Sequence, residues 1–176
     1  MNLNIIILAA GNGKRMHSSL PKVMHKVGGK PMLEHVLISA KKLKPNSINV
    51  VLNSKIESIK ESFKSYDVRW HNQLEQNGTA DAVKTVLPSL KKDEKVLILY
   101  ADTPLIDSNL LETFINYMPK SDVKVLTVEL ENPFGYGRII REQAEEEIIS
   151  KIIEETEADH IQKNIKECNT GIIFSD

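Results

Sequence analysis

The chain has 176 residues, of which 41% are hydrophobic and 27% are charged, and this balance predicts one soluble globular domain. Its 23 basic and 24 acidic side chains give a formal net charge of −1, which argues against a dedicated nucleic-acid binder. One cysteine, Cys168, excludes an internal disulfide, and no basic leader follows Met1, so we expect a cytoplasmic protein. No apolar run approaches the ~20 residues of a membrane span, so we expect no membrane insertion.

Apolar runs alternate with helical spacings along the first 130 residues. The runs predict strands at residues 3–8, 48–52, 68–71, 96–100 and 123–130. The helical spacings predict helices at about residues 31–42, 54–64, 79–87 and 108–117. The first strand is almost entirely apolar, which is typical of strands buried on both faces of a parallel sheet. The alternation therefore predicts an α/β fold with a mostly parallel, doubly wound sheet.

The sequence changes in character from Glu131 onward. Asn132, Pro133 and two glycines form a loop, and only short segments at residues 138–141 and 148–153 follow. We expect this part to be an α+β addition that covers one side of a cleft, within the same domain.

A small-residue loop follows the first strand at residues 8–16 (LAAGNGKRM). It fails the dinucleotide fingerprint because Met16 occupies the third glycine position, and it fails the Walker A pattern because Arg15 stands where Ser or Thr is required. Ligands bind at the carboxyl edge of open parallel sheets, and glycine lets a phosphate approach the backbone. Arg15 and Lys22 would supply the positive charge. The alternative is a tight turn with solvated cations.

Asp102 follows the predicted strand at residues 96–100, so a parallel sheet would place it on the same edge as the glycine loop. A carboxylate at that edge can hold Mg²⁺ beside phosphates. The alternative is an aspartate that caps a helix or turn before Pro104.

A series of ordered motifs extends along nearly the whole chain. The motifs are residues 8–16, PKVMH at 21–25, GKPMLEHV at 29–36, Gln73, Gln76, GTA at 78–80, YAD at 100–102, NP at 132–133, GYGRI at 135–139, Glu154 and NTG at 169–171. In this order they resemble the uridyltransferase domain of the bacterial bifunctional N-acetylglucosamine-1-phosphate uridyltransferases, which are sugar nucleotidyltransferases. The resemblance implies a Rossmann-like, mostly parallel sheet and the transfer of UMP from UTP to N-acetylglucosamine 1-phosphate, with Mg²⁺ as cofactor.

The resemblance also implies a role for each matching residue. Catalysis would depend on Arg15 and Lys22. The nucleotide would contact Leu8, Ala9, Ala10, Gly11, Lys22, Gln73, Gly78, Thr79, Tyr100, Ala101 and Asp102. The sugar would contact Gly137, Glu154 and Asn169. The metal would bind Asp102.

Three positions depart from the usual family pattern, namely Lys14, Asp81 and Ala101, and the last two would reduce nucleotide affinity. The chain stops at Asp176. We therefore expect a monomeric fragment that lacks both a second metal-ligating asparagine and the acetyltransferase β-helix that builds the family's trimer, with little turnover. Two alternatives stay open: another sugar-phosphate nucleotidyltransferase, or a non-catalytic nucleotide-binding fragment.

Overall fold

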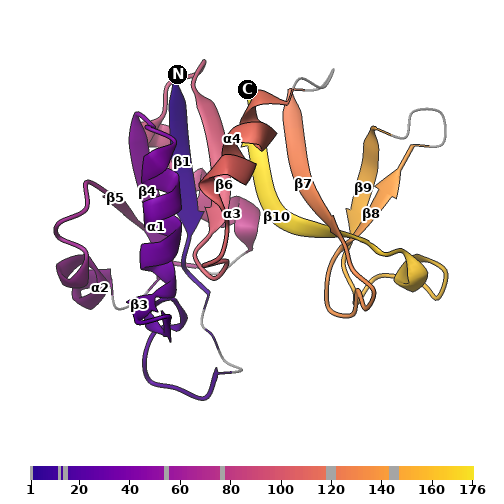
Figure 1. Cartoon of the computed structure of the whole chain (residues 1–176), viewed down its shortest axis with the longest axis horizontal. Coiled ribbons are helices and arrows are strands. Elements are labelled where there is room, and N and C mark those ends of the chain that lie inside the picture. The colour runs from indigo at the N-terminus through magenta and orange to yellow at the C-terminus, as the bar shows by residue number, and fades with distance from the viewer. Residues whose placement is uncertain are drawn as a thin grey trace. The chain divides into compact units, whose positions relative to one another are not determined.

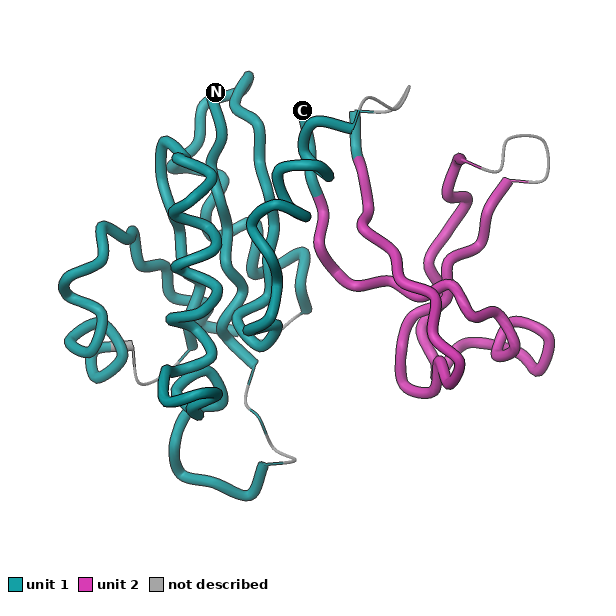
Figure 2. Tube along the Cα trace, viewed as in Figure 1, with its two compact units in different colours: residues 1–123, 174–176 teal, residues 124–173 magenta. Residues whose placement is uncertain are grey.

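The chain divides into two compact units in a computed structural model. The first unit comprises Met1–Val123 with Phe174–Asp176, and the second comprises Lys124–Ile173 (Figure 2). The structure describes residues 2–11, 13, 16–53, 56–75, 78–117, 122–142 and 147–176. Within these residues no helix has both the length and the apolar character needed to cross a membrane.

The first unit alternates strands with helices in the predicted order (Figure 1). Its strands are β1 (Leu3–Leu8), β2 (Lys26–Val27), β3 (Lys30–Pro31), β4 (Ser47–Leu52), β5 (Arg69–Asn72) and β6 (Lys95–Tyr100). Its α-helices are α1 (Met32–Lys42), α2 (Ile56–Ser62), α3 (Thr79–Lys84) and α4 (Ser108–Asn116). Short 3-10 helices lie at η2 (Lys22–Met24) and η3 (Leu87–Ser89).

The sheet of the first unit has the strand order β5-β4-β1-β6. β1 pairs in parallel with both β4 and β6, and β4 pairs in parallel with β5. All six residues of β1 are buried, as its apolar run predicts for a central strand. The prediction of a mostly parallel sheet is confirmed, and all its strands end at the same edge.

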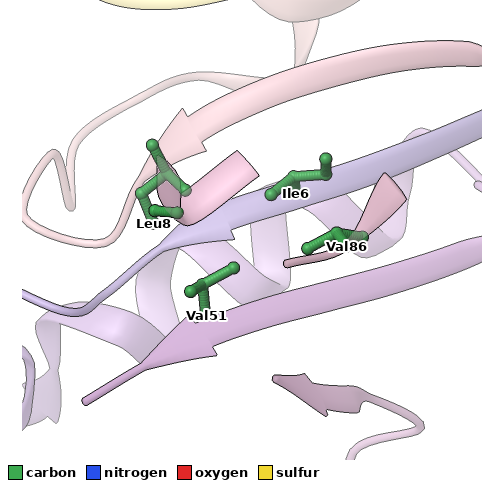
Figure 3. Packing of buried hydrophobic residues seen from close by; sticks show 5 residues of the cluster. Ile6, Leu8, Val51 and Val86 are labelled. Atoms are coloured by element: carbon green, nitrogen blue, oxygen red, sulfur yellow. The ribbon is translucent and has the colours of Figure 1, made fainter. Parts of the chain in front are cut away.

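One face of this sheet packs against α3 and the turn after it. Successive side chains of a strand alternate between the two faces, so Ile6 and Leu8 share one face of β1. They form a buried cluster with Val51 of β4 and with Ala82 and Val86 (Figure 3). This packing holds α3 against the carboxyl end of β1.

A polar side-chain network crosses the same sheet through Asn49 of β4, which is fully buried. Its amide donates to Ser47 Oγ at 2.9 Å, and its oxygen lies 3.0 Å from Nε2 of His71 in β5. Burial lowers the pKa of His71, an effect that a backbone hydrogen bond with Thr85 opposes in part and the charge of Arg69 reinforces.

The lowered pKa of His71 makes stability depend on pH. The folded chain keeps this imidazole neutral at pH values below its unfolded pKa of about 6.5. The contribution of His71 to the free energy of unfolding is therefore complete above that pH and is lost as the pH falls. We expect the melting temperature of the wild type to fall more between about pH 7.5 and 5.5 than that of His71→Gln. Thermal melts across this range test it, with exposed His160→Gln as the control, and equal pH slopes for wild type and His71→Gln would contradict it.

The second unit contains β7 (Val123–Glu129), β8 (Arg138–Arg141), β9 (Ile149–Ile153), η4 (Gln162–Asn164) and most of β10 (Glu167–Ser175). β10 pairs with β7 and, antiparallel, with β8, which pairs antiparallel with β9. Cys168 is fully buried in β10, and this burial raises the pKa of its thiol, so the reactive thiolate is disfavoured.

Two expectations about boundaries need correction. The change in architecture comes at Lys124, earlier than Glu131, because β7 pairs with β10 of the second unit and not within a parallel series. The third helix ends at Lys84, and a turn and the 3-10 helix η3, which contains Pro88, take the place of its expected last turn. Pro88 has no backbone N–H to donate to an α-helix.

Candidate functional site

A pocket of about 300 Å³ opens in the first unit at the carboxyl ends of β1 and β6. The first turn of α3 and the 3-10 helix η2 complete its wall. The lining residues are Leu8, Ala9, Ala10, Gly11, Lys22, Val23, Gln73, Gly78, Thr79, Ala82, Tyr100 and Asp102. They come from five separate stretches of sequence, which the parallel sheet gathers at one edge.

Backbone hydrogen bonds hold this edge in place beyond the ends of the strands. Ala9 N–H donates to Val51 at 2.8 Å, and Gln73 N–H donates to Leu52 at 2.8 Å. The side-chain amide of Asn53 donates to the carbonyl of Ala10 at 2.6 Å. The pocket wall is therefore an extension of the sheet itself, which suits a preorganised site.

Two glycines of the loop after β1 serve different purposes. Gly13 has a φ of +56°, and a Cβ there would lie 2.9 Å from Cβ of Lys22, so this glycine lets the loop pack against Lys22. A Cβ at Gly11 would meet no atom within 4 Å. Packing within the protein therefore does not require glycine at Gly11, which lines the pocket.

The charged groups of the pocket form an ion pair. Nζ of Lys22 donates to Oδ2 of Asp102, although the two residues are 80 positions apart. Both side chains are 34% exposed, so a ligand in the pocket can reach them. The pair places a cation, which can bind phosphate, beside a carboxylate, which can hold Mg²⁺.

Polar groups on the α3 side of the pocket are organised around Gln73, which is 5% exposed. Its Nε2 donates to the carbonyl of Gly78 at 3.2 Å and to Oδ2 of Asp81 at 3.3 Å. Nearby, the hydroxyls of Thr79 and Tyr100 lie 3.2 Å apart. These contacts connect β5, α3 and β6 across the pocket.

The structure brings the predicted nucleotide residues together around this pocket, with one exception. Ala101 is 1% exposed and does not line it, because its N–H continues the pairing with Leu8 and its side chain is buried. Val23 and Ala82 line the pocket but were not predicted; the apolar spacing of α3 could have indicated Ala82. Arg15, predicted as catalytic, lies outside the described residues.

The three predicted sugar residues lie together in the second unit. Asn169 N–H donates to the carbonyl of Gly137 at 2.8 Å. A Cβ on Gly137 would lie 3.3 Å from Oε1 of Glu154 and 3.1 Å from Cγ2 of Ile152, so a larger residue would make these side chains shift by a few tenths of an ångström. The Glu154 side chain is exposed, while Asn169 is half-buried and its Oδ1 accepts from Gly171 N–H at 2.8 Å.

An ion pair with a buried arginine lies beside these residues. Arg138 is 1% exposed, and its Nη2 donates to Oε2 of Glu155 at 2.7 Å. Gly135 N–H donates to the same oxygen at 3.1 Å. Hydrogen bonds from Arg138 and Gly135 lower the pKa of Glu155, so the carboxylate stays charged. Arg138 also donates to the carbonyl of Tyr136, which fixes the loop before β8.

The donor set of the pocket fits Mg²⁺ only in combination with a ligand. Within the described ranges no group of three or more His, Cys, Asp or Glu side chains could hold a metal ion. Asp102 supplies a single carboxylate at the pocket. Mg²⁺ is commonly held by one or two carboxylates with substrate phosphates and water, so Asp102 is compatible with that arrangement.

Residues 5–165 match the model of the MobA-like NTP transferase domain. The chain is 43% identical over 176 residues to the bifunctional protein GlmU of Idiomarina loihiensis, covering 100% of this chain and 38% of that protein. It is 45% identical over 172 residues to the bifunctional protein GlmU of Nitrosococcus oceani, covering 98% of this chain and 38% of that protein. The chain therefore spans less than half the length of these relatives.

Solved structures share the fold at lower identity. The inositol-1-phosphate CTP transferase from T. maritima superposes with a TM-score of 0.77 at 18% identity, over 98% of this chain and 69% of that chain. UDP-glucose pyrophosphorylase complexed with UDP-glucose superposes with a TM-score of 0.76 at 17% identity, over 99% of this chain and 76% of that chain. These likenesses establish the fold, a Rossmann-like α/β architecture with a mostly parallel sheet.

Proposed function

Because the chain belongs to the MobA-like NTP transferase domain family, we propose that it transfers UMP from UTP to N-acetylglucosamine 1-phosphate and releases pyrophosphate. The observation that carries the proposal is the pocket at the end of β1, where residues matched to the nucleotide site of the uridyltransferases converge around Lys22 and Asp102. The identity to two bifunctional GlmU proteins supports the choice of base and sugar over other nucleotidyltransferases.

In this proposal the reaction needs no protein nucleophile. An oxygen of the sugar phosphate attacks the α-phosphorus of UTP, and the bond from that phosphorus to the pyrophosphate oxygen breaks. Catalysis then depends on positioning and on neutralising the charge that develops on the phosphates. Lys22 lines the pocket and is placed to neutralise this charge. Arg15, which lies outside the described residues, is the second cation that the sequence motif proposes for the phosphates.

Asp102 would hold Mg²⁺, which when bound would supply positive charge to neutralise the phosphates. Asp102 pairs with Lys22, and a phosphate in the pocket would offer the Lys22 ammonium a second negatively charged partner. The acceptor sugar would use the second unit, where the exposed carboxylate of Glu154 can accept hydrogen bonds from hydroxyl groups.

A pyrophosphate-release assay tests the proposed function. The chain is offered each of UTP, CTP, dTTP and GTP with N-acetylglucosamine 1-phosphate, and then UTP with glucose 1-phosphate. Fastest release with UTP and N-acetylglucosamine 1-phosphate supports the proposal. A preference for another pair would assign a different nucleotidyltransferase, and UTP binding in calorimetry without any release would indicate a non-catalytic nucleotide-binding protein.

Arg15→Ala is expected to lower turnover at least tenfold and to weaken UTP binding, because a charge-assisted contact to phosphate is lost. The same assay and calorimetry measure both effects. Arg69→Ala, an exposed arginine of β5, is the matched control and should change neither. Normal turnover and normal UTP affinity in Arg15→Ala would remove Arg15 from the phosphate site.

A further inference from the structure

Gln73 can offer a ligand only a hydrogen-bond acceptor. A primary amide carries two N–H donors and one acceptor oxygen. Both partners of Nε2 are oxygens, the carbonyl of Gly78 at 3.2 Å and the carboxylate of Asp81 at 3.3 Å. Neither partner can donate, so the nitrogen and not the oxygen must face them. Oε1 has no hydrogen-bond partner among the residues that the structure describes, and Gln73 lines the pocket.

We propose that Asp81 is a positioning residue that holds the Gln73 amide with its oxygen available to the base, and thereby makes the pocket prefer UTP to CTP. This inference rests on the proposed function. Uracil carries an N–H at ring position 3, which donates to an acceptor oxygen. Cytosine carries a lone pair at the same position, which would face the oxygen and leave both acceptors unpaired.

Of the two acceptors that face Nε2 of Gln73, Asp81 forms the stronger hydrogen bond. Its carboxylate accepts only, and a hydrogen bond to a charged group is stronger than one to a neutral carbonyl. A Gln73 amide turned by 180° would set its oxygen against both Asp81 and Gly78. Asparagine at position 81 has the same size but can also donate, so it would accept the turned amide. Asp81→Asn therefore keeps the packing of α3 and relaxes the orientation of Gln73.

Calorimetry with UTP and CTP in the presence of Mg²⁺ measures the effect as a ratio of dissociation constants. The ratio cancels the gain in affinity for both nucleotides when a negative charge is removed near the phosphates. We expect the wild type to prefer UTP, and Asp81→Asn to lower this preference about tenfold. Asp93→Asn, which removes an exposed carboxylate from the loop before β6, is the matched control and should keep the wild-type ratio.

A double-mutant cycle shows whether Asp81 acts through Gln73. Gln73→Met keeps the volume of the side chain and removes its hydrogen bonds, so Asp81→Asn should not change the ratio further in that background. If the wild type prefers UTP and Asp81→Asn keeps the full preference, or if it lowers the ratio equally in both backgrounds, the role of Asp81 is overturned while the proposed function stands. If the wild type binds UTP and CTP equally, the proposed choice of base fails, and this inference fails with it.

Discussion

Asp102→Asn is expected to lower pyrophosphate release about a thousandfold, because it removes the carboxylate at the pocket that is proposed to hold Mg²⁺. Asparagine has nearly the same size, so the fold should be retained. The variant also leaves the Lys22 ammonium without its carboxylate partner and free to contact phosphate. Nucleotide binding without metal should therefore persist or strengthen, while the gain in UTP affinity that Mg²⁺ confers should disappear.

Calorimetry of UTP with and without Mg²⁺ separates these two effects. Asp93→Asn serves again as the matched control and should keep the wild-type response to Mg²⁺. If Asp102→Asn retained the full Mg²⁺-dependent gain in UTP affinity, Asp102 would not be the metal ligand, whatever happened to turnover. This readout does not depend on the chain being an efficient catalyst, so it tests the metal site separately from the reaction.

The strands that could be predicted from the sequence are those whose residues are apolar because they are buried in the sheet. β1, β4 and β6 are apolar runs buried against helices on a parallel sheet, and sequence periodicity located each of them within about two residues. β10 was not predicted as a strand, because residues 167–175 mix buried and half-exposed positions and contain a glycine in their middle. The hairpin of β2 and β3 was missed because each strand has only two residues, too few to show an alternating pattern.

The site was predictable where it consists of strand ends. A parallel sheet places the residues after β1 and β6 on one edge, so Gly11 and Asp102 could be expected to lie near each other. Side-chain partners at long range could not be derived in that way. The ion pair of Lys22 with Asp102 and the hydrogen bond of Gln73 with Asp81 depend on how loops and α3 pack. Ala101 shows the same limit, since alternation along a strand end decides whether it faces the pocket or the interior.

The burial of Arg138 could not be predicted from hydrophobic patterns or from sequence motifs. An arginine is expected at the surface unless it is paired, yet this one is 1% exposed. Its partner Glu155 and the carbonyls of Tyr136 and Lys163 surround the guanidinium. The pair thereby connects the loop before β8 to the segment that carries Glu154, within the unit proposed to bind the sugar.

Removing the carboxylate of this pair should cost more than removing both charges. Glu155→Gln leaves the guanidinium of Arg138 buried without its counter-charge, and we expect the free energy of unfolding to fall. The double variant Arg138→Met/Glu155→Leu leaves no buried charge, and its unfolding free energy should recover at least half of that loss, because an apolar pair of similar volume can replace a buried ion pair.

Urea denaturation of the wild type, Glu155→Gln and the double variant measures these differences. Exposed Glu157→Gln, two positions along the chain, controls for the loss of a carboxylate and should unfold like the wild type. A Glu155→Gln chain as stable as the wild type would mean that water or the neighbouring carbonyls already compensate the Arg138 charge. A double variant less stable than Glu155→Gln would show that the hydrogen bonds of Arg138 to the loop, and not its charge, hold this region together.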